Sequence, residues 1–87
     1  MEVLREWLKR TTTYREFTAQ WLADEDGRIP ERFLKRVEER EAEIAAKMLP
    51  GDELWEWECG DRAFAMRWGL AIVRAGAVVE SWLEWKS

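Results

Sequence analysis

The sequence of 87 residues contains no histidine, a single cysteine and only two prolines. Without histidine, the chain lacks the commonest general base and one of the commonest metal ligands. Because Cys59 is alone, no disulfide can close within the chain, and a cysteine-based zinc site is excluded. A single thiol suits a reducing compartment, so we expect a cytoplasmic protein.

Long apolar runs are also absent. No stretch approaches the roughly 18 apolar residues that a membrane-spanning helix needs. Residues 2–10 carry charged side chains where a secretory signal would have an apolar segment. The sequence therefore predicts neither a membrane segment nor an export signal.

The charge balance favours acid, with 14 Lys and Arg against 18 Asp and Glu and a formal net charge of -4. Non-specific binding to nucleic acid or to anionic membrane needs a basic surface, so both are disfavoured. A partner protein of opposite charge fits better. A chain this short buries only roughly 60–65% of its extended surface. Its seven tryptophans can offset that shortage, since each removes about 150–250 Å² from water when buried.

Before residue 50, apolar residues recur at helical spacing. Thr13 and Glu16 have the spacing of a capping box, in which each side chain satisfies the other residue's backbone N–H. Pro30 suits the first position of a helix, because its missing N–H costs nothing there. The expected helices span residues 2–10, 13–23 and 30–49, and the first two are either separate or one bent helix.

After Gly51 the apolar period changes to two, which indicates strands. Gly60-Asp61 and Ala75-Gly76 have the length and glycine content of two-residue hairpin loops. These loops fix a register that puts the bulky residues on one side. We therefore predict one α+β domain, in which residues 51–87 form a three-stranded antiparallel meander and two or three helices from residues 1–50 pack on its bulky face. That face comprises Trp55, Trp57, Phe64, Met66, Trp68, Leu70, Ile72, Val79, Leu83 and Trp85.

The segment GDELWEWE, followed by GLAIVRAGAVVESW, resembles the C-terminal halves of small uncharacterised bacterial and phage-type proteins. In those proteins a helix precedes a D-E-L-W-aromatic strand and a hairpin of the type A-I-V-R-x-G-x-V-V. The match covers residues 51–82 in pieces. An aspartate before the turn glycine is more usual, and this chain has Ala75 there. The resemblance implies the hairpin and points to no catalytic residue.

Few residues are candidates for chemistry. Glu56 and Glu58 fall on one strand face about 7 Å apart, and paired carboxylates can hydrolyse glycosidic bonds. Charges on an edge strand also prevent aggregation, which is the simpler interpretation. The acidic residues 24–26 lack the spacing of a calcium loop, and Cys59 has no activating base. We therefore expect no enzyme, no metal and no cofactor.

One residue of the predicted outer face stands out. Trp82 lies opposite Gly69 in the expected register, where its ring can cover the bare backbone. Tryptophan is also enriched at binding hot spots, so we consider a contact surface around it. In the same register Arg67 faces Glu84, as an ion pair. The expected contact residues are Leu54, Arg67, Val73, Val78, Glu80, Trp82 and Glu84.

These features favour a small acidic, non-catalytic interaction protein. It would act by occupying the surface of a partner protein, as phage-borne inhibitors, immunity proteins and antitoxins do. One alternative is a structural homodimer that pairs through the edge strand at residues 78–85. Another is weak binding of nucleotide or nucleic acid by a basic stripe on the third helix, which consists of Arg28, Arg32, Lys35 and Arg36.

Overall fold

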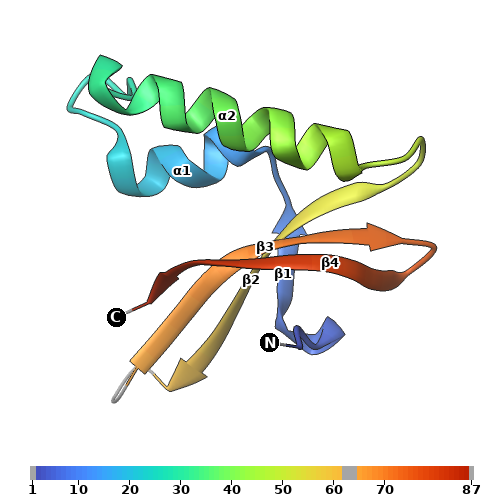
Figure 1. Cartoon of the computed structure of the whole chain (residues 1–87). Helices are drawn as coiled ribbons and strands as arrows, with labels where there is room; N and C mark the ends of the chain where they lie inside the picture. The colour runs from blue at the N-terminus through green and yellow to red at the C-terminus, as the bar shows by residue number, and fades with distance from the viewer. Residues whose placement is uncertain (1, 62–64, 87) are drawn as a thin grey trace. The chain divides into compact units, whose positions relative to one another are not determined.

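A computed structural model describes residues 2–61 and 65–86, which form two compact units along the chain. One unit combines Met1–Thr12 with Leu49–Ser87 and contains the sheet. The other, Thr13–Met48, contains two α-helices (Figure 1). In chain order the elements are a 3-10 turn at Arg5–Trp7, β1 at Leu8–Thr11, α1 at Tyr14–Leu22, α2 at Glu31–Lys47, β2 at Glu53–Asp61, β3 at Ala65–Arg74 and β4 at Ala77–Lys86.

The α+β class is confirmed, with two α-helices and a four-stranded antiparallel sheet among the described residues. The sheet order β1-β2-β3-β4 follows the chain. The prediction of three strands was wrong, because a fourth comes from a segment expected to be helical. That the helices pack on one face of the sheet stays a prediction, as does the single domain.

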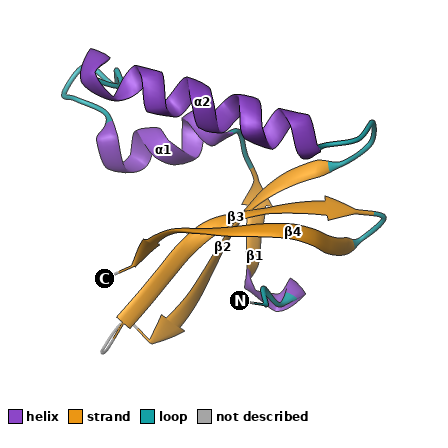
Figure 2. Cartoon of the chain, viewed as in Figure 1, coloured by secondary structure: helices purple, strands orange, loops and turns teal. Residues whose placement is uncertain are grey.

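Local sequence signals set the helix boundaries. The backbone N–H of Glu16 donates to Thr13 Oγ1 at 3.0 Å, so α1 begins where the predicted capping box places it. Pro30 was predicted to be the first helical residue and is instead the N-cap of α2, which begins at Glu31. Met48 is the C-cap of that helix. The two helices lie side by side (Figure 2).

Within the helical unit, an ion pair connects the helices. Arg15 on α1 contacts Glu41 on α2 with two hydrogen bonds, Nη2 to Oε1 at 2.6 Å and Nε to Oε2 at 3.3 Å. Phe17, Val37 and Ile44 are buried. The connection between the helices is a turn around Asp24, whose Oδ1 accepts from two backbone N–H groups. The acidic residues 24–26 therefore include a turn-forming carboxylate.

Residues 2–10 do not form the predicted helix. They form a 3-10 turn and then β1, in which Leu8 lies opposite Trp57 and Thr11 lies opposite Trp55. An isolated helix this short is marginal in water, and the threonines that follow favour extended backbone. Pairing with β2 therefore outweighs the helical spacing of the apolar residues in this segment.

The β2–β3 hairpin also differs from the prediction. Gly60 and Asp61, expected to be its loop, belong to β2 and pair with Met66 and Ala65. Residues 62–64, which include the predicted core residue Phe64, lie outside the described residues. The register is displaced by an odd number of positions, and such a shift exchanges the faces of one strand relative to the other.

The bulky residues consequently divide between two faces of the sheet. Directly opposite residues of an antiparallel pair share a face. We call one side the Trp57 face, which includes Trp55, Trp57, Gly69, Ala71 and Val73, and the other the Leu70 face, which includes Leu54, Trp68, Leu70, Ile72 and Trp85. The prediction that Trp55, Trp57, Trp68 and Trp85 share one face is therefore wrong.

Trp57 is the central side chain of the sheet unit. It is only 1% exposed, and its indole N–H donates to the carbonyl oxygen of Leu70 at 3.1 Å. Its ring lies over Gly69, where an added Cβ would come within 2.6 Å of two ring carbons. Trp7 packs beside it, with the ring centroids 5.9 Å apart. Val3 and Ala71 complete this core. The backbone carbonyl oxygen of Trp82 lies closer still to that Cβ position, so Gly69 leaves space both for the Trp57 ring and for the backbone of β4.

The β3–β4 hairpin confirms the predicted loop at Ala75-Gly76. Arg74 pairs with Ala77, and both loop residues have positive φ, 50° for Ala75 and 80° for Gly76. Positive φ at both positions is the pattern of a type I′ turn, whose twist matches that of the flanking strands.

Beyond this turn, β4 carries two bulges that the sequence did not predict. Val73 pairs with Val78 but Ile72 pairs with Glu80, so Val79 is an extra residue in β4. In the same way, Gly69 pairs with Leu83 and Trp68 pairs with Trp85, which makes Glu84 extra. The predicted pairs Ile72–Val79, Gly69–Trp82 and Arg67–Glu84 are therefore wrong.

We expect Trp57→Ala to lower the free energy of unfolding by about 3–5 kcal/mol, the usual cost of deleting a large buried aromatic side chain. Trp55→Ala is the matched control on the same strand and face, and it should cost less because Trp55 is only half-buried. Urea unfolding followed by circular dichroism measures both values. A larger loss for Trp55→Ala would contradict the central position of Trp57.

Ala75→Asn should raise the free energy of unfolding by about 1 kcal/mol, because asparagine tolerates the left-handed conformation better than alanine. Ala77→Asn is the control at the other end of the turn, where the backbone is extended and asparagine is a poor strand residue. The same urea titration should show the two variants shifted in opposite directions, and equal shifts would argue against strain at Ala75.

Candidate interaction surface

The predicted contact residues do not form one surface. Leu54, Glu80 and Trp82 pair in register with residues of the Leu70 face, whereas Arg67, Val73 and Val78 lie on the Trp57 face. Glu84 occupies the second bulge of β4. The structure therefore divides the set between the two sides of the sheet. The role of these residues in partner contact stays a prediction.

Burial separates the predicted residues further. Leu54 is 8% exposed and Val73 is 6% exposed, so neither offers much side chain to a partner. Trp82 is half-buried opposite Leu70, and the ring that lies over Gly69 is that of Trp57, whereas Trp82 approaches Gly69 with its backbone carbonyl oxygen. Arg67 is exposed opposite Lys86. Of the predicted surface, mainly Arg67 and the partly exposed residues of β4 remain accessible.

The outer edge of β4 is the more prominent feature. β4 is a terminal strand of the sheet, and no described strand pairs with its outer side. Two of its large apolar side chains are well exposed, Val79 at 43% and Leu83 at 42%. Both were predicted to be buried, because the strict alternation assumed for β4 is broken by the bulge at Val79 and by the changed register. No glycine or proline in β4 marks those bulges in the sequence.

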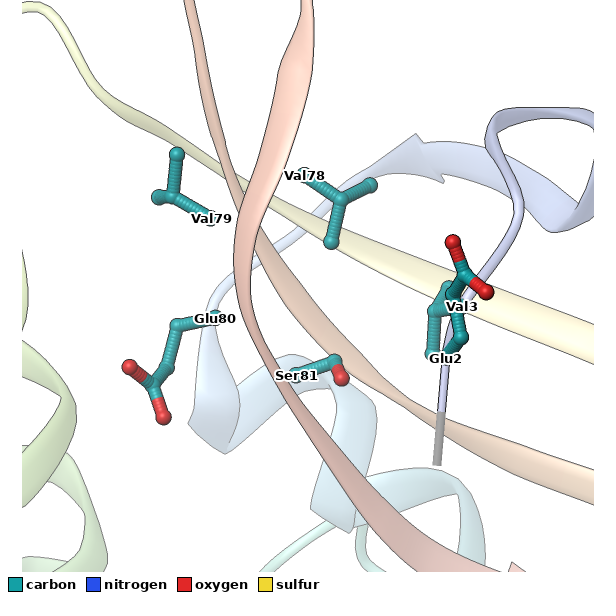
Figure 3. A pocket seen from close by; sticks show the side chains of 6 residues that line it. All are labelled: Glu2, Val3, Val78, Val79, Glu80 and Ser81. Atoms are coloured by element: carbon teal, nitrogen blue, oxygen red, sulfur yellow. The ribbon is translucent and has the colours of Figure 1, made fainter.

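A groove of about 390 Å³ follows the first half of β4. Its lining consists of Glu2, Val3, Val78, Val79, Glu80 and Ser81. Figure 3 shows Val78 and Ser81 on the same side of the strand as Glu2 and Val3, with Val79 and Glu80 on the opposite side. The lining that the groove exposes is mainly polar, and it includes one carboxylate on each side of the strand.

A partly buried ion pair fixes the turn end of the β3–β4 hairpin. Arg74 donates from Nε to Asp52 Oδ1 and from Nη2 to Asp52 Oδ2, both at 2.9 Å. The Asp52 side chain is 1% exposed, and its Oδ2 also accepts from the backbone N–H of Leu49. Hydrogen bonds from Arg74 and from Leu49 lower the pKa of Asp52, and Asp52 raises the pKa of Arg74.

Of the two glutamates predicted as a carboxylate pair, Glu56 has a structural role. Glu56 forms an ion pair with Arg10, its register partner on β1, and its side chain is 13% exposed. Glu58 lies opposite Trp68. Within the described ranges, no three His, Cys, Asp or Glu residues are arranged to hold a metal ion.

The basic stripe is only partly helical. Arg28 precedes α2, whereas Arg32, Lys35 and Arg36 lie on it, and all four residues are exposed. The guanidinium carbon of Arg32 lies 4.7 Å from the ring centroid of Phe33. Nucleotide or nucleic-acid binding by this stripe stays a prediction.

Comparison with known proteins adds no relative. No family model matches the chain, and neither the curated proteins nor the solved structures contain a match. In the part of the chain that the structure describes, neither α-helix has both the length and the apolar character that crossing a membrane requires.

We expect Asp52→Asn to destabilise the protein at pH 7, because the buried hydrogen bonds of Asp52 are then made by a neutral amide. In the wild type the folded-state pKa of Asp52 lies below the unfolded value of about 3.9. Its contribution is therefore present above that value and is lost as the pH falls through the folded pKa.

The difference between wild type and Asp52→Asn should consequently shrink below about pH 4. Urea unfolding between pH 7 and pH 2 checks this, with Asp26→Asn in the exposed helical turn as the control that keeps the wild-type profile. A difference between wild type and Asp52→Asn that stays constant with pH would contradict the ion pair.

Proposed function

We propose that this chain is a small acidic, non-catalytic protein-binding module that acts by occupying a partner's surface, in the manner of inhibitors and of immunity or antitoxin proteins. The observation that carries the proposal is the exposed outer edge of β4, with Val79 and Leu83 in solvent. Proteins can bind a partner by adding its strand to an unpaired sheet edge, and exposed apolar side chains at such an edge provide further contact.

The position of this edge also suits a binding role. The turn before β4 is held by the bidentate Asp52–Arg74 pair, and β3 beneath it is anchored through Gly69 and Trp57. A contact surface on a rigid element loses less conformational entropy on binding than one on a loose loop. The edge is thus presented in a fixed conformation.

Self-pairing through β4 is the weaker candidate. A homodimer would bring two bulged strands together, and each bulge at Val79 and Glu84 interrupts the alternation that a long antiparallel ladder needs. Bulges on edge strands are also a common means of preventing edge-to-edge association. We therefore favour a different protein as the partner.

The test replaces Val79 and Leu83 together by threonine, which removes apolar surface and keeps strand propensity. Affinity capture from a lysate of the native host, followed by mass spectrometry, should recover a protein with wild type and several-fold less of it with the double variant. Leu49→Thr is the control, because Leu49 is an exposed leucine outside β4. Equal recovery by wild type and the double variant would show that binding does not use this edge. A concentration-dependent dimer detected by light scattering would favour self-association.

A further inference from the structure

The groove along β4 has a chemical character that restricts its occupant. It lies beside the unpaired edge of the strand, its accessible lining is mainly polar, and Val79 is its well-exposed apolar side chain. The two acidic residues of its lining, Glu2 and Glu80, are on opposite sides of β4 (Figure 3). The chain as a whole carries a net charge of -4. A cationic occupant therefore complements both the groove and the molecule.

An extended segment fits the shape of this edge. The free backbone groups of an edge strand bind another strand through main-chain hydrogen bonds. The bulge at Val79 limits regular pairing, so the segment is short and depends more on its side chains. Lysine and arginine can lay their aliphatic stems on valine while the charged head reaches a carboxylate.

Strand geometry then sets the spacing of the basic residues. Successive side chains of an extended segment point to opposite faces. One basic residue can reach Glu2 on the Trp57 side, and a second can reach Glu80 on the other side only if the two are an odd number of positions apart. Two basic residues separated by a single residue would both point to the same side.

Resting on the proposed function above, we propose that the partner of this module inserts a short extended segment with two basic residues at odd spacing, most simply adjacent, along residues 78–81 of β4. The apolar stems lie against Val78 and Val79, and the cationic heads pair with Glu2 and Glu80. A carboxylate accepts several hydrogen bonds at once, so existing contacts of these glutamates are compatible with a bound cation.

Three capped hexapeptides test the spacing. Thr-Val-Lys-Arg-Val-Thr has adjacent basic residues, Thr-Lys-Val-Arg-Val-Thr has the same composition with even spacing, and Thr-Val-Glu-Asp-Val-Thr reverses the charge. Titration of the full chain, followed by backbone amide shifts in nuclear magnetic resonance, should show the first peptide binding more tightly than the second, by up to about fivefold, since one additional surface ion pair has at most about that effect. The shifts should concentrate at residues 78–81, and the acidic peptide should not bind.

Two double variants that remove the same charge isolate the role of the carboxylates. Glu2→Gln combined with Glu80→Gln should abolish the preference for adjacent basic residues. Glu25→Gln combined with Glu39→Gln, which removes the same charge from exposed sites in the helical unit, should retain it. Loss of the preference in the second pair would assign it to net charge alone and overturn the proposal.

Other results also overturn this inference. Equal binding of the two basic peptides, binding of the acidic peptide, no binding at all, or shifts centred on α2 would each refute the dibasic segment in the groove. If these occur while the threonine variant at Val79 and Leu83 still loses its captured partner, the binding function stands and only the nature of the segment is wrong. If that capture is also unaffected, both proposals fail.

Discussion

The sheet unit depends on the contact between the Trp57 ring and the backbone at Gly69. A Cβ at that position would collide with the indole, and the indole N–H is already committed to the Leu70 carbonyl group. This contact fixes which residues of β2 and β3 face each other, because a shift of one residue would place a side chain under the ring. Trp7 and Val3 then pack around it, which draws the N-terminal segment into the sheet.

The same contact explains why the contact surface differs from the predicted one. Since Trp57, and not Trp82, covers Gly69, the predicted outer face loses its central residue. The two bulges then displace β4 relative to β3 and turn Val79 and Leu83 into exposed residues. An apolar edge next to an acidic groove replaces the single mixed patch around Trp82, and it is this edge that the binding hypothesis uses.

Features set by local chemistry could be predicted from the sequence, and features set by register could not. The Thr13 cap and the Ala75-Gly76 turn depend on residues close in the chain, so their signals are self-contained. β1 and the β2–β3 register depend on contacts between distant segments, such as Leu8 with Trp57. For the candidate site, the sequence drew attention to β4 and its acidic residues, and their role in binding stays a prediction. Bulges without glycine or proline leave no signal by which Val79 could have been recognised as exposed.

The position of β1 in the chain has a consequence for how the protein is made. β1 leaves the ribosome before the helical unit Thr13–Met48, yet its hydrogen-bonding partner β2 is translated only after that unit. The helical hairpin has local contacts and can form early, whereas the first strand must wait for its neighbour. During that interval Val3, Trp7 and Leu8 lack their partners in the sheet, and charged residues such as Arg5 and Glu6 beside them disfavour aggregation of this segment.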